Sequence, residues 1–346
     1  KPIICFNFID KFLFFINAIF ALLLFISCFV PQIPVTHFAY FSILSLTVPV
    51  LVLFNLLFLT YWLAKRKRQL LLSAFVLLLG YICLGNFFRF KLAEEVIEES
   101  DLSIMSYNVR GFNKYDLLND PSAEGRIMEF ISSEAPDILC IQEFDRIKDR
   151  QLKKMYPFKF ITDYRSNEGK STQAIYSKFV IINSGSMDFP DSGNNALFAD
   201  IIVKKDTIRV YNLHLESHRI IPSVRRLSNE PKGRLLKRLS KSFAKQGEQA
   251  QLVEKDIEAT PYKKIVCGDF NNTQFSNVYK VIKGDMKDSF TEQGTGYGRT
   301  FNFRYYPVRI DFILADEAFE IMAHKNFDIK LSDHFPVMAS IKIGSK

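Results

Sequence analysis

The chain has 346 residues, 48% of them hydrophobic, and a formal net charge of +8 at pH 7. This length allows one large domain or two of ordinary size. The residues up to Lys91 hold eight basic side chains and one acid, which leaves 37 basic and 36 acidic residues for the remainder. The excess of basic charge therefore belongs mostly to the N-terminal part, and it does not indicate a chain that binds nucleic acid along its whole length.

The N-terminal part contains three long apolar segments, at 12–30, 38–64 and 70–88, and none of them contains Asp, Glu, Lys or Arg. A membrane-spanning helix needs about 20 apolar residues. Three such segments so close together leave no polar face for a soluble helix. We therefore predict a membrane anchor with three transmembrane helices over residues 1–91, followed by a second domain over residues 92–346. The alternatives are buried helices of a soluble protein and a cleaved signal peptide.

The loop between the second and third segments carries four consecutive basic residues, KRKR at 65–68. Basic residues beside membrane-spanning helices are found mainly on the cytoplasmic side. We therefore expect an integral membrane protein with a cytoplasmic N-terminus and an extracytoplasmic second domain, in the periplasm if the membrane is a bacterial inner membrane. Arg89 and Lys91 favour the opposite orientation, but they are fewer.

Beyond residue 100 the sequence changes to short apolar runs separated by polar loops. Runs of this length predict β-strands, and apolar residues at helical spacing predict two helices among them. The predicted helices cover 121–135 and 233–258, and the predicted strands cover 102–109, 136–144, 171–182, 196–203, 207–217, 263–270, 308–315 and 334–343. Many strands with interspersed helices indicate an α/β domain.

Polar side chains lie at or near the ends of these predicted strands, where a strand of the core would simply turn. A single Asp in such a place is usually a turn former or a helix cap. The whole set suits a hard cation such as Mg²⁺, which prefers oxygen ligands, together with groups that aim a water molecule and donate a proton. The set comprises four carboxylates, two amides and two imidazoles: Glu143, Asp269, Asp311, Asp333, Asn108, Asn271, His214 and His334.

The same part of the chain carries seven short segments in a fixed order: SYNVRGFN, DILCIQEF, AIYSK, YNLHLES, CGDFNN, RIDFIL and LSDHFPV. In type and order they resemble the endonuclease/exonuclease/phosphatase superfamily, which includes DNase I-like nucleases, sphingomyelinases and inositol-polyphosphate phosphatases. The resemblance covers roughly residues 100–344. It implies a four-layer α/β sandwich, in which two β-sheets lie face to face between helices and the site lies at one edge of the sheets.

The resemblance also implies a metal site. Glu143 is similar to the principal metal ligand of the family, and Asn108 and Asp333 are expected beside the metal, directly or through water. The expected ion is Mg²⁺, with Mn²⁺ as a substitute.

Five further roles follow from the resemblance and concern the phosphate. Asp269 is expected to orient or deprotonate the attacking water, and Asn271 to donate to the scissile phosphate. His334 is expected to contact the phosphate, with Asp311 as its carboxylate partner. His214 resembles the imidazole that helps to protonate the leaving group, and the sequence does not identify its acidic partner.

These expectations describe a membrane-anchored, metal-dependent phosphoester hydrolase, a phosphodiesterase in which water attacks phosphorus. The substrate stays open between a lipid headgroup, suggested by the anchor, and extracytoplasmic nucleic acid. A DNase I-like endonuclease or exonuclease is suggested by His214 and by the segment 219–245, which holds nine basic residues and one acid. A catalytically inactive binding module on the same fold is the alternative of another class.

Two pairs of residues match no catalytic position. Cys140 and Cys267 are expected to be small buried residues, although a disulfide between them is chemically allowed outside the cytoplasm. His218 and His324 are expected on the surface. No protein partner can be identified.

Overall fold

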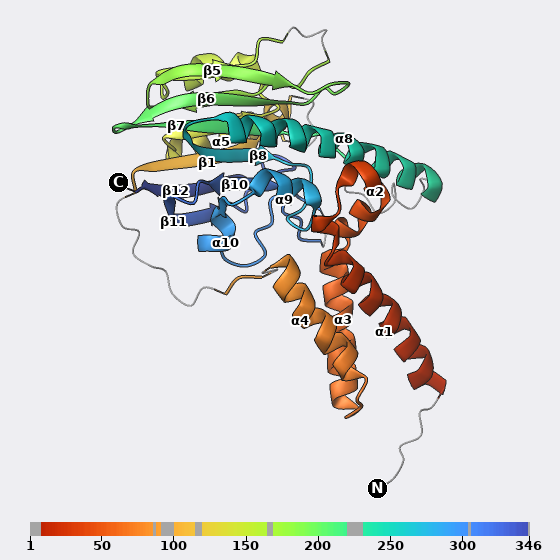
Figure 1. Ribbon diagram of the computed structural model, residues 1–346. Coiled ribbons are helices and arrows are strands. Elements are labelled where there is room, and N and C mark those ends of the chain that lie inside the picture. The colour runs from red at the N-terminus through yellow and green to blue at the C-terminus, as the bar shows by residue number, and fades with distance from the viewer. Residues whose placement is uncertain are drawn as a thin grey trace.

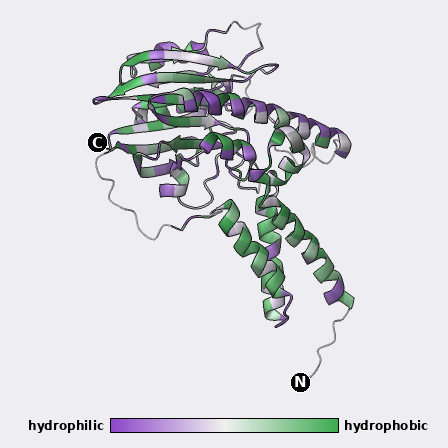
Figure 2. Ribbon diagram, viewed as in Figure 1, coloured by the Kyte–Doolittle hydropathy of each residue, from purple (hydrophilic) through white to green (hydrophobic). Residues whose placement is uncertain are grey.

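The chain begins with apolar helices that extend away from the rest of the molecule (Figure 1). They are α1 (Phe8–Ser27), α3 (Val48–Ala64) and α4 (Leu70–Leu84), and a shorter helix, α2 (Val35–Ser42), lies between α1 and α3 in the chain. The computed structural model describes residues 8–85, 88–90, 100–114, 120–164, 169–219, 231–303 and 306–344. Figure 2 shows that α1, α3 and α4 are hydrophobic along almost their whole length.

The structure does not support three full membrane spans. Within the described ranges, only Phe8–Gln32 is by itself long and apolar enough to cross a membrane. The second predicted segment is broken, because Phe38–Leu46 meets Val48–Ala64 at an angle of 59°. Pro49 lies in the first turn of α3, and a proline cannot continue a helix from the preceding turn. The third helix ends at Leu84, before a glycine with a positive φ of 77°, and is too short to count as a span.

The part beyond residue 100 forms two six-stranded sheets. The first has the order β11-β12-β1-β2-β4-β3 and the second the order β5-β6-β7-β8-β10-β9. Each sheet contains one parallel pair, β1 with β2 and β7 with β8, and its other pairs are antiparallel. The strands are β1 (Leu102–Asn108), β2 (Ile138–Gln142), β3 (Phe158–Ile161), β4 (Ala174–Ser177), β5 (Ile181–Asp188), β6 (Asn195–Val203), β7 (Asp206–His214), β8 (Lys263–Asp269), β9 (Lys287–Asp288), β10 (Asp311–Ala315), β11 (Phe319–Asn326) and β12 (Val337–Ile343).

Helices cover the outer faces of the two sheets, which confirms the predicted α/β sandwich. Apolar residues of both sheets form the central core, and this core includes Cys140 and Cys267 as free, buried thiols. On the first sheet the outer core contains residues of α5 (Ala123–Glu134). On the second sheet the outer core contains residues of α8 (Lys232–Ala259) and α9 (Asn277–Lys283). A small helix, α10 (Ser289–Gln293), packs beside β10 and β11.

One strand prediction was wrong in its extent. The segment 171–182 was predicted as one strand, but it contains β4 of the first sheet and the start of β5 of the second. The chain crosses between the sheets here, and a continuous apolar pattern does not reveal such a crossing. Neither β3 nor β11 was predicted.

The α2 segment packs into the outer core of the second sheet. Val35 is buried in the same cluster as Phe243 and Ala250 of α8. Gly247 of α8 allows this approach, because a Cβ atom there would lie 3.1 Å from the Cβ of Val35. Figure 1 shows α2 beside α8. The N-terminal helices and the sandwich therefore share part of one hydrophobic core.

Candidate active site

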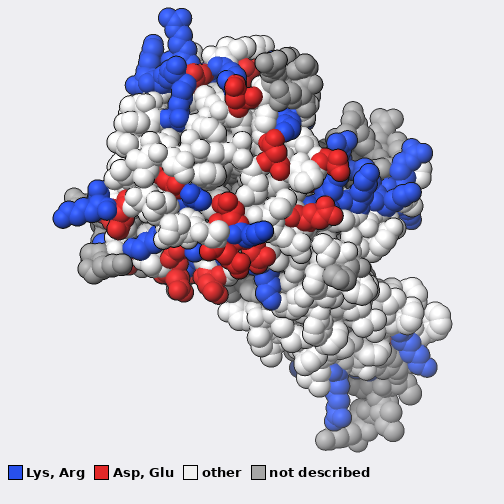
Figure 3. Space-filling view, turned by 45° about the horizontal axis from the view of Figure 1, so that its top comes forward, with Lys and Arg blue, Asp and Glu red and all other residues white. Residues whose placement is uncertain are grey.

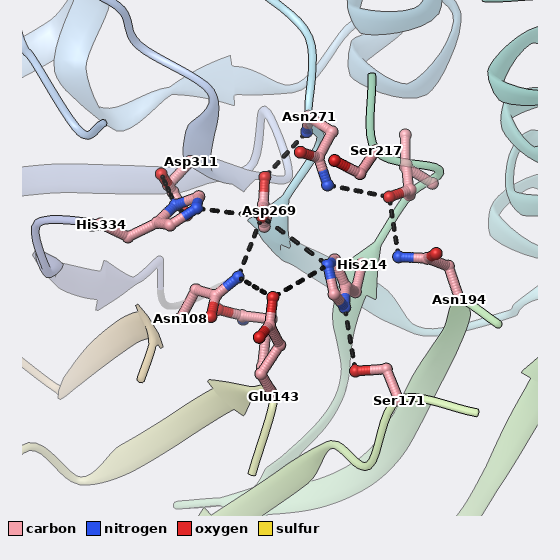
Figure 4. A network of polar contacts seen from close by, with 12 residues as sticks. Asn108, Glu143, Ser171, Asn194, His214, Ser217, Asp269, Asn271, Asp311 and His334 are labelled. Carbon is pink, nitrogen blue, oxygen red and sulfur yellow. Dashed lines mark hydrogen bonds and ion pairs between the residues drawn. The ribbon is translucent and has the colours of Figure 1, made fainter. Parts of the chain in front are cut away.

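The eight predicted site residues lie at one edge of the two sheets, and all of them except Asp333 are labelled in Figure 4. Because β1 and β2 are parallel, and β7 and β8 are parallel, the carboxyl ends of each pair meet at the same edge. The antiparallel neighbours β10 and β12 begin at that edge. Asn108, His214 and Asp269 end β1, β7 and β8. Glu143 follows β2, Asn271 follows β8 and Asp311 begins β10, whereas Asp333 and His334 precede β12.

Asp269 lies at the centre of this group and is buried. In the β-sheet register it is opposite both His214 and Asp311. The preceding residue, Gly268, has a φ of 133°, and a Cβ atom there would lie 2.1 Å from the backbone oxygen of Leu213. Glycine at this position therefore lets β8 approach β7 closely enough to carry Asp269 into the site.

The Asp269 carboxylate is held from several sides. Its Oδ1 accepts a hydrogen bond from the backbone N–H of Asn271 (2.8 Å), and its Oδ2 accepts one from Nδ2 of Asn108 (3.1 Å). The Nε2 atoms of His334 and His214 lie 3.6 and 3.8 Å from the same Oδ2. Burial raises the pKa of Asp269 to about 6, and the Asp311 carboxylate adds to this rise while the two imidazoles oppose it.

His334 and Asp311 form a buried pair. The Nδ1 atom of His334 lies 3.0 Å from Oδ2 of Asp311, and the backbone N–H of Asp311 donates to Oγ1 of Thr300 (3.0 Å). Burial by itself lowers the pKa of His334, but the carboxylates of Asp311 and Asp269 outweigh it and raise the pKa to about 10. The imidazole is therefore a cation at neutral pH, with its Nε2–H directed toward Asp269.

His214 has a different partner. Its Nδ1 atom lies 3.2 Å from the hydroxyl of Ser171, and its Nε2 atom lies 3.8 Å from Asp269 and 3.9 Å from Glu143. The sequence left the partner of this histidine open. The structure supplies a serine from the loop before β4, which sequence reasoning missed because a single serine in a loop is not distinctive.

Glu143 and Asp333 present the most accessible carboxylates of the group. Their side chains are 41% and 20% exposed, and both line the cavity described below. Glu143 has a positive φ of 51° and accepts a hydrogen bond from Nδ2 of Asn108 (3.3 Å), whereas Asp333 is paired with Arg110 (2.5 Å). Two carboxylates facing a water-accessible cavity fit Mg²⁺ or Mn²⁺, which takes oxygen ligands and retains several waters.

Asn108 is arranged to position carboxylates. Its side-chain oxygen accepts from the backbone N–H of Arg110 (3.1 Å), and its Nδ2 donates to both Glu143 and Asp269. Its oxygen accepts one hydrogen bond and keeps a second lone pair. The position expected of Asn108 beside a metal, directly or through water, therefore stays a prediction.

A second group of potential metal ligands lies deeper. The ligand atoms of Asp269, Asp311 and His334 all lie within 4.8 Å of one another. In this group, Nδ1 of His334 and the carboxylate of Asp311 already contact each other and are less available to a metal ion. Glu143 and Asp333, the predicted ligands, are more exposed, and their assignment to a metal stays a prediction.

Asn271 is fixed by its surroundings. Its Nδ2 donates to the backbone oxygen of Leu215 (2.9 Å), which leaves one amide hydrogen for a substrate. The neighbouring Asn272 is buried and donates to Oε1 of Gln246 (2.7 Å), and Gln246 in turn donates to the backbone oxygen of Asn271 (3.2 Å). Asn272 therefore shapes the turn that carries Asn271.

The surface position predicted for His218 was wrong. This residue is buried, its Nδ1 lies 2.7 Å from Oγ of Ser242, and its ring centroid lies 4.3 Å from that of Phe243, with the two rings tilted by 41°. Burial, with a smaller contribution from Arg238, lowers the pKa of His218 to about 3. It follows the His214 strand by only a few residues, so the chain carries it into the core beside α8.

The family model described as "Endonuclease/Exonuclease/phosphatase family" matches residues 105–334. The chain belongs to this family. Membership of the family supports a phosphoester hydrolase, and enzymes of the family generally depend on a divalent metal. A second model, described as a domain of unknown function (DUF8431), matches residues 10–87. No curated protein matches this chain.

Solved structures support the family fold. An endonuclease/exonuclease/phosphatase family protein from Bacteroides thetaiotaomicron is 20% identical, with 69% of this chain and 97% of that chain covered and a TM-score of 0.53. A mannosyl-6-phosphatase from the same organism is 20% identical over 69% of this chain and 99% of that chain, with a TM-score of 0.52. D. rerio TDP2, complexed with a single-strand DNA product, is 18% identical over 70% of this chain and 98% of that chain, with a TM-score of 0.51.

Proposed function

We propose that this protein is a membrane-anchored phosphodiesterase that uses a divalent metal ion and a water molecule that attacks phosphorus. The observation that carries the proposal is the buried Asp269 carboxylate, whose Oδ2 lies 3.8 Å from Nε2 of His214 and 3.6 Å from Nε2 of His334. His214 ends the neighbouring strand β7, and His334 comes from the segment before β12 of the other sheet. A carboxylate of raised pKa beside a cationic imidazole provides both a base for water and a donor for a phosphate oxygen.

Each residue has a role that follows from its contacts. Asp269, with a pKa of about 6, is ionised at neutral pH and takes a proton from the attacking water. His334, kept cationic by Asp311, donates from Nε2 to a phosphate oxygen. His214 has its Nε2 atom free for the leaving oxygen, because its Nδ1 atom is engaged by Ser171.

The metal would be held by Glu143 and Asp333, with Asn108 orienting the Glu143 carboxylate. When bound, Mg²⁺ or Mn²⁺ would neutralise charge on the non-bridging phosphate oxygens. Arg110 holds Asp333 at the rim of the cavity and adds a second positive charge there. The complete set of acid, base and metal-binding groups argues against a catalytically inactive binding module.

The membrane part of the proposal rests on the helices. α1 has 20 residues, about 30 Å at the usual rise per residue, which matches the hydrocarbon core of a bilayer. α3 and α4 have 17 and 15 residues, and polar contacts join them to α1: Nδ2 of Asn17 donates to Ser73 (2.8 Å) and Nε1 of Trp62 donates to Asn17 (3.0 Å). We propose that α1 crosses the membrane and that α3 and α4 pack against it.

The orientation follows from the two ends of this helical bundle. In Figure 1 the loop between α3 and α4, which carries Lys65–Arg68, lies at the end far from the sandwich. If this basic loop is cytoplasmic, the sandwich lies on the extracytoplasmic side.

Removal of the metal is the test of this proposal. We expect the full chain, reconstituted in nanodiscs, to hydrolyse bis-p-nitrophenyl phosphate with Mg²⁺ or Mn²⁺. A cation is needed to neutralise the charge on the non-bridging phosphate oxygens. EDTA should therefore abolish turnover, and added metal should restore it. Turnover that persists unchanged in EDTA would contradict a metal-dependent enzyme, and absence of turnover with either metal would remove support for a general phosphodiesterase.

A further inference from the structure

The polar residues of the site line part of a cavity of about 780 Å³. This part of the lining comprises Glu143, His214, Asp269, Asn271, Asp333 and His334, together with Arg110 and Arg219. The rest of the lining is mainly apolar, and it includes Leu46, Val50, Leu235, Phe301, Phe303 and Ile310. We call this part the apolar groove. An enzyme that recognised only a small phosphate would not need so large an apolar extension.

The N-terminal helices supply part of the groove. Leu46 ends the short helix that precedes α3, and Val50 lies in the first turn of α3. Two hydrogen bonds hold this segment on the sandwich: Oγ1 of Thr273 donates to the backbone oxygen of Ser45 (3.1 Å), and the hydroxyl of Tyr306 donates to that of Leu46 (2.5 Å). The groove is therefore complete only in the full chain.

The groove continues onto an apolar surface of the bundle. Val50, Leu53 and Leu57 are all exposed, and their spacing of three and seven residues places them on one side of α3. α3 leads away from the sandwich toward the far end of the bundle (Figure 1). A hydrocarbon chain that lies along α3 in the membrane could thus enter the groove without crossing a charged surface.

We propose that the substrate is a membrane lipid phosphoester. Its headgroup phosphate would lie beside the polar residues of the site, and its hydrocarbon chain would lie in the apolar groove. This inference rests on the proposed phosphodiesterase function and names its substrate class. The two arginines of the cavity match the anionic headgroup, and the apolar groove matches the chain.

Nucleic acid fits the same cavity less well. Single-stranded nucleic acid is bound by aromatic platforms for the bases and by basic side chains along the backbone. Two of the aromatic rings are engaged within the protein, since Phe301 packs edge-on against His334 (4.9 Å) and the hydroxyl of Tyr306 is bonded to Leu46. The aliphatic residues offer no surface for stacking. Figure 3 shows one of several groups of basic side chains over the N-terminal half of α8. None of the basic side chains of α8 lines the cavity, to which that half of the helix contributes Leu235 and Leu239.

A homologous series of p-nitrophenyl alkyl phosphates, from methyl to octyl, tests the inference. We expect kcat/KM of the full chain in nanodiscs to rise about fourfold for each methylene group that the groove buries, until the groove is filled. Val50→Trp fills the groove, so it should lower the octyl-to-methyl ratio of kcat/KM at least tenfold.

The matched control is Leu63→Trp, which adds the same ring to an exposed position in the last turn of α3, at the other end of that helix. It should keep the wild-type ratio, because partition of the substrates into the bilayer is the same for both variants. A flat series in the wild type, with the methyl compound still turned over, would overturn the inference alone. Loss of turnover of every member would overturn the proposed function as well. Faster turnover of a single-stranded oligonucleotide than of the octyl compound would also overturn the inference that the substrate is a lipid.

Discussion

Replacement of Asp269 by Asn is expected to lower kcat/KM for a phosphodiester by about 10³-fold, the usual contribution of a general base. The amide cannot accept the proton of the attacking water, and it also removes a negative charge that raises the pKa of His334. The measurement is steady-state turnover of bis-p-nitrophenyl phosphate by the full-length variant in nanodiscs.

The same substitution has two opposing effects on stability. Burial raises the pKa of Asp269, and a neutral amide removes the cost of burying its charge. The amide NH2 group, however, replaces an oxygen that accepts a hydrogen bond from Asn271 or Asn108, and the lost charge no longer stabilises the His334 cation. The control is Asp206→Asn, which neutralises an exposed carboxylate at the opposite end of β7 and should retain wild-type turnover. Less than a tenfold loss of activity in Asp269→Asn, measured well below the apparent Tm of the variant, would contradict the role of a base.

Glu143→Gln is expected to lower kcat/KM about 100-fold at a fixed Mg²⁺ concentration, a loss of ~3 kcal/mol of transition-state stabilisation. An amide of the same shape removes one negative charge from the metal site, so the metal concentration that gives half-maximal activity should rise at least tenfold. Metal titration of the full-length variant measures both quantities.

Glu320→Gln serves as the matched control, since Glu320 is exposed on β11, outside the residues that line the cavity. It should titrate with metal as the wild type does. An unchanged metal dependence in Glu143→Gln would assign the metal to other residues, and the deeper group of Asp269, Asp311 and His334 would then be the first to examine.

The sandwich and the position of its site could be predicted from the sequence because strand ends carry the polar residues. Asn108, Glu143 and Asp269 each follow an apolar run, and parallel neighbours bring such ends to one edge. Their hydrogen-bond partners could not be predicted in the same way. Ser171 lies in a loop 43 residues from His214, and Thr300 lies in a loop 11 residues from Asp311. Nothing in the local pattern distinguishes either from other hydroxyl residues.

The membrane part was predicted less well, for two physical reasons. A count of apolar residues over 38–64 does not register the break before α3, although Pro49 is visible in the sequence and argues for it. The docking of α2 on α8 depends on the contact of Val35 with Gly247, and neither residue is unusual in its own segment. Apolar residues of α2 were therefore assigned to the membrane, whereas they pack on the sandwich.

The central claim is that water attacks phosphorus at this site, and isotope labelling tests it most directly. The full-length protein would turn over bis-p-nitrophenyl phosphate with Mg²⁺ in water enriched in ¹⁸O, and both products would be analysed by mass spectrometry. The account predicts one ¹⁸O atom in the p-nitrophenyl phosphate and none in the p-nitrophenol. Label in the p-nitrophenol, or release of product without label in the phosphate, would contradict it.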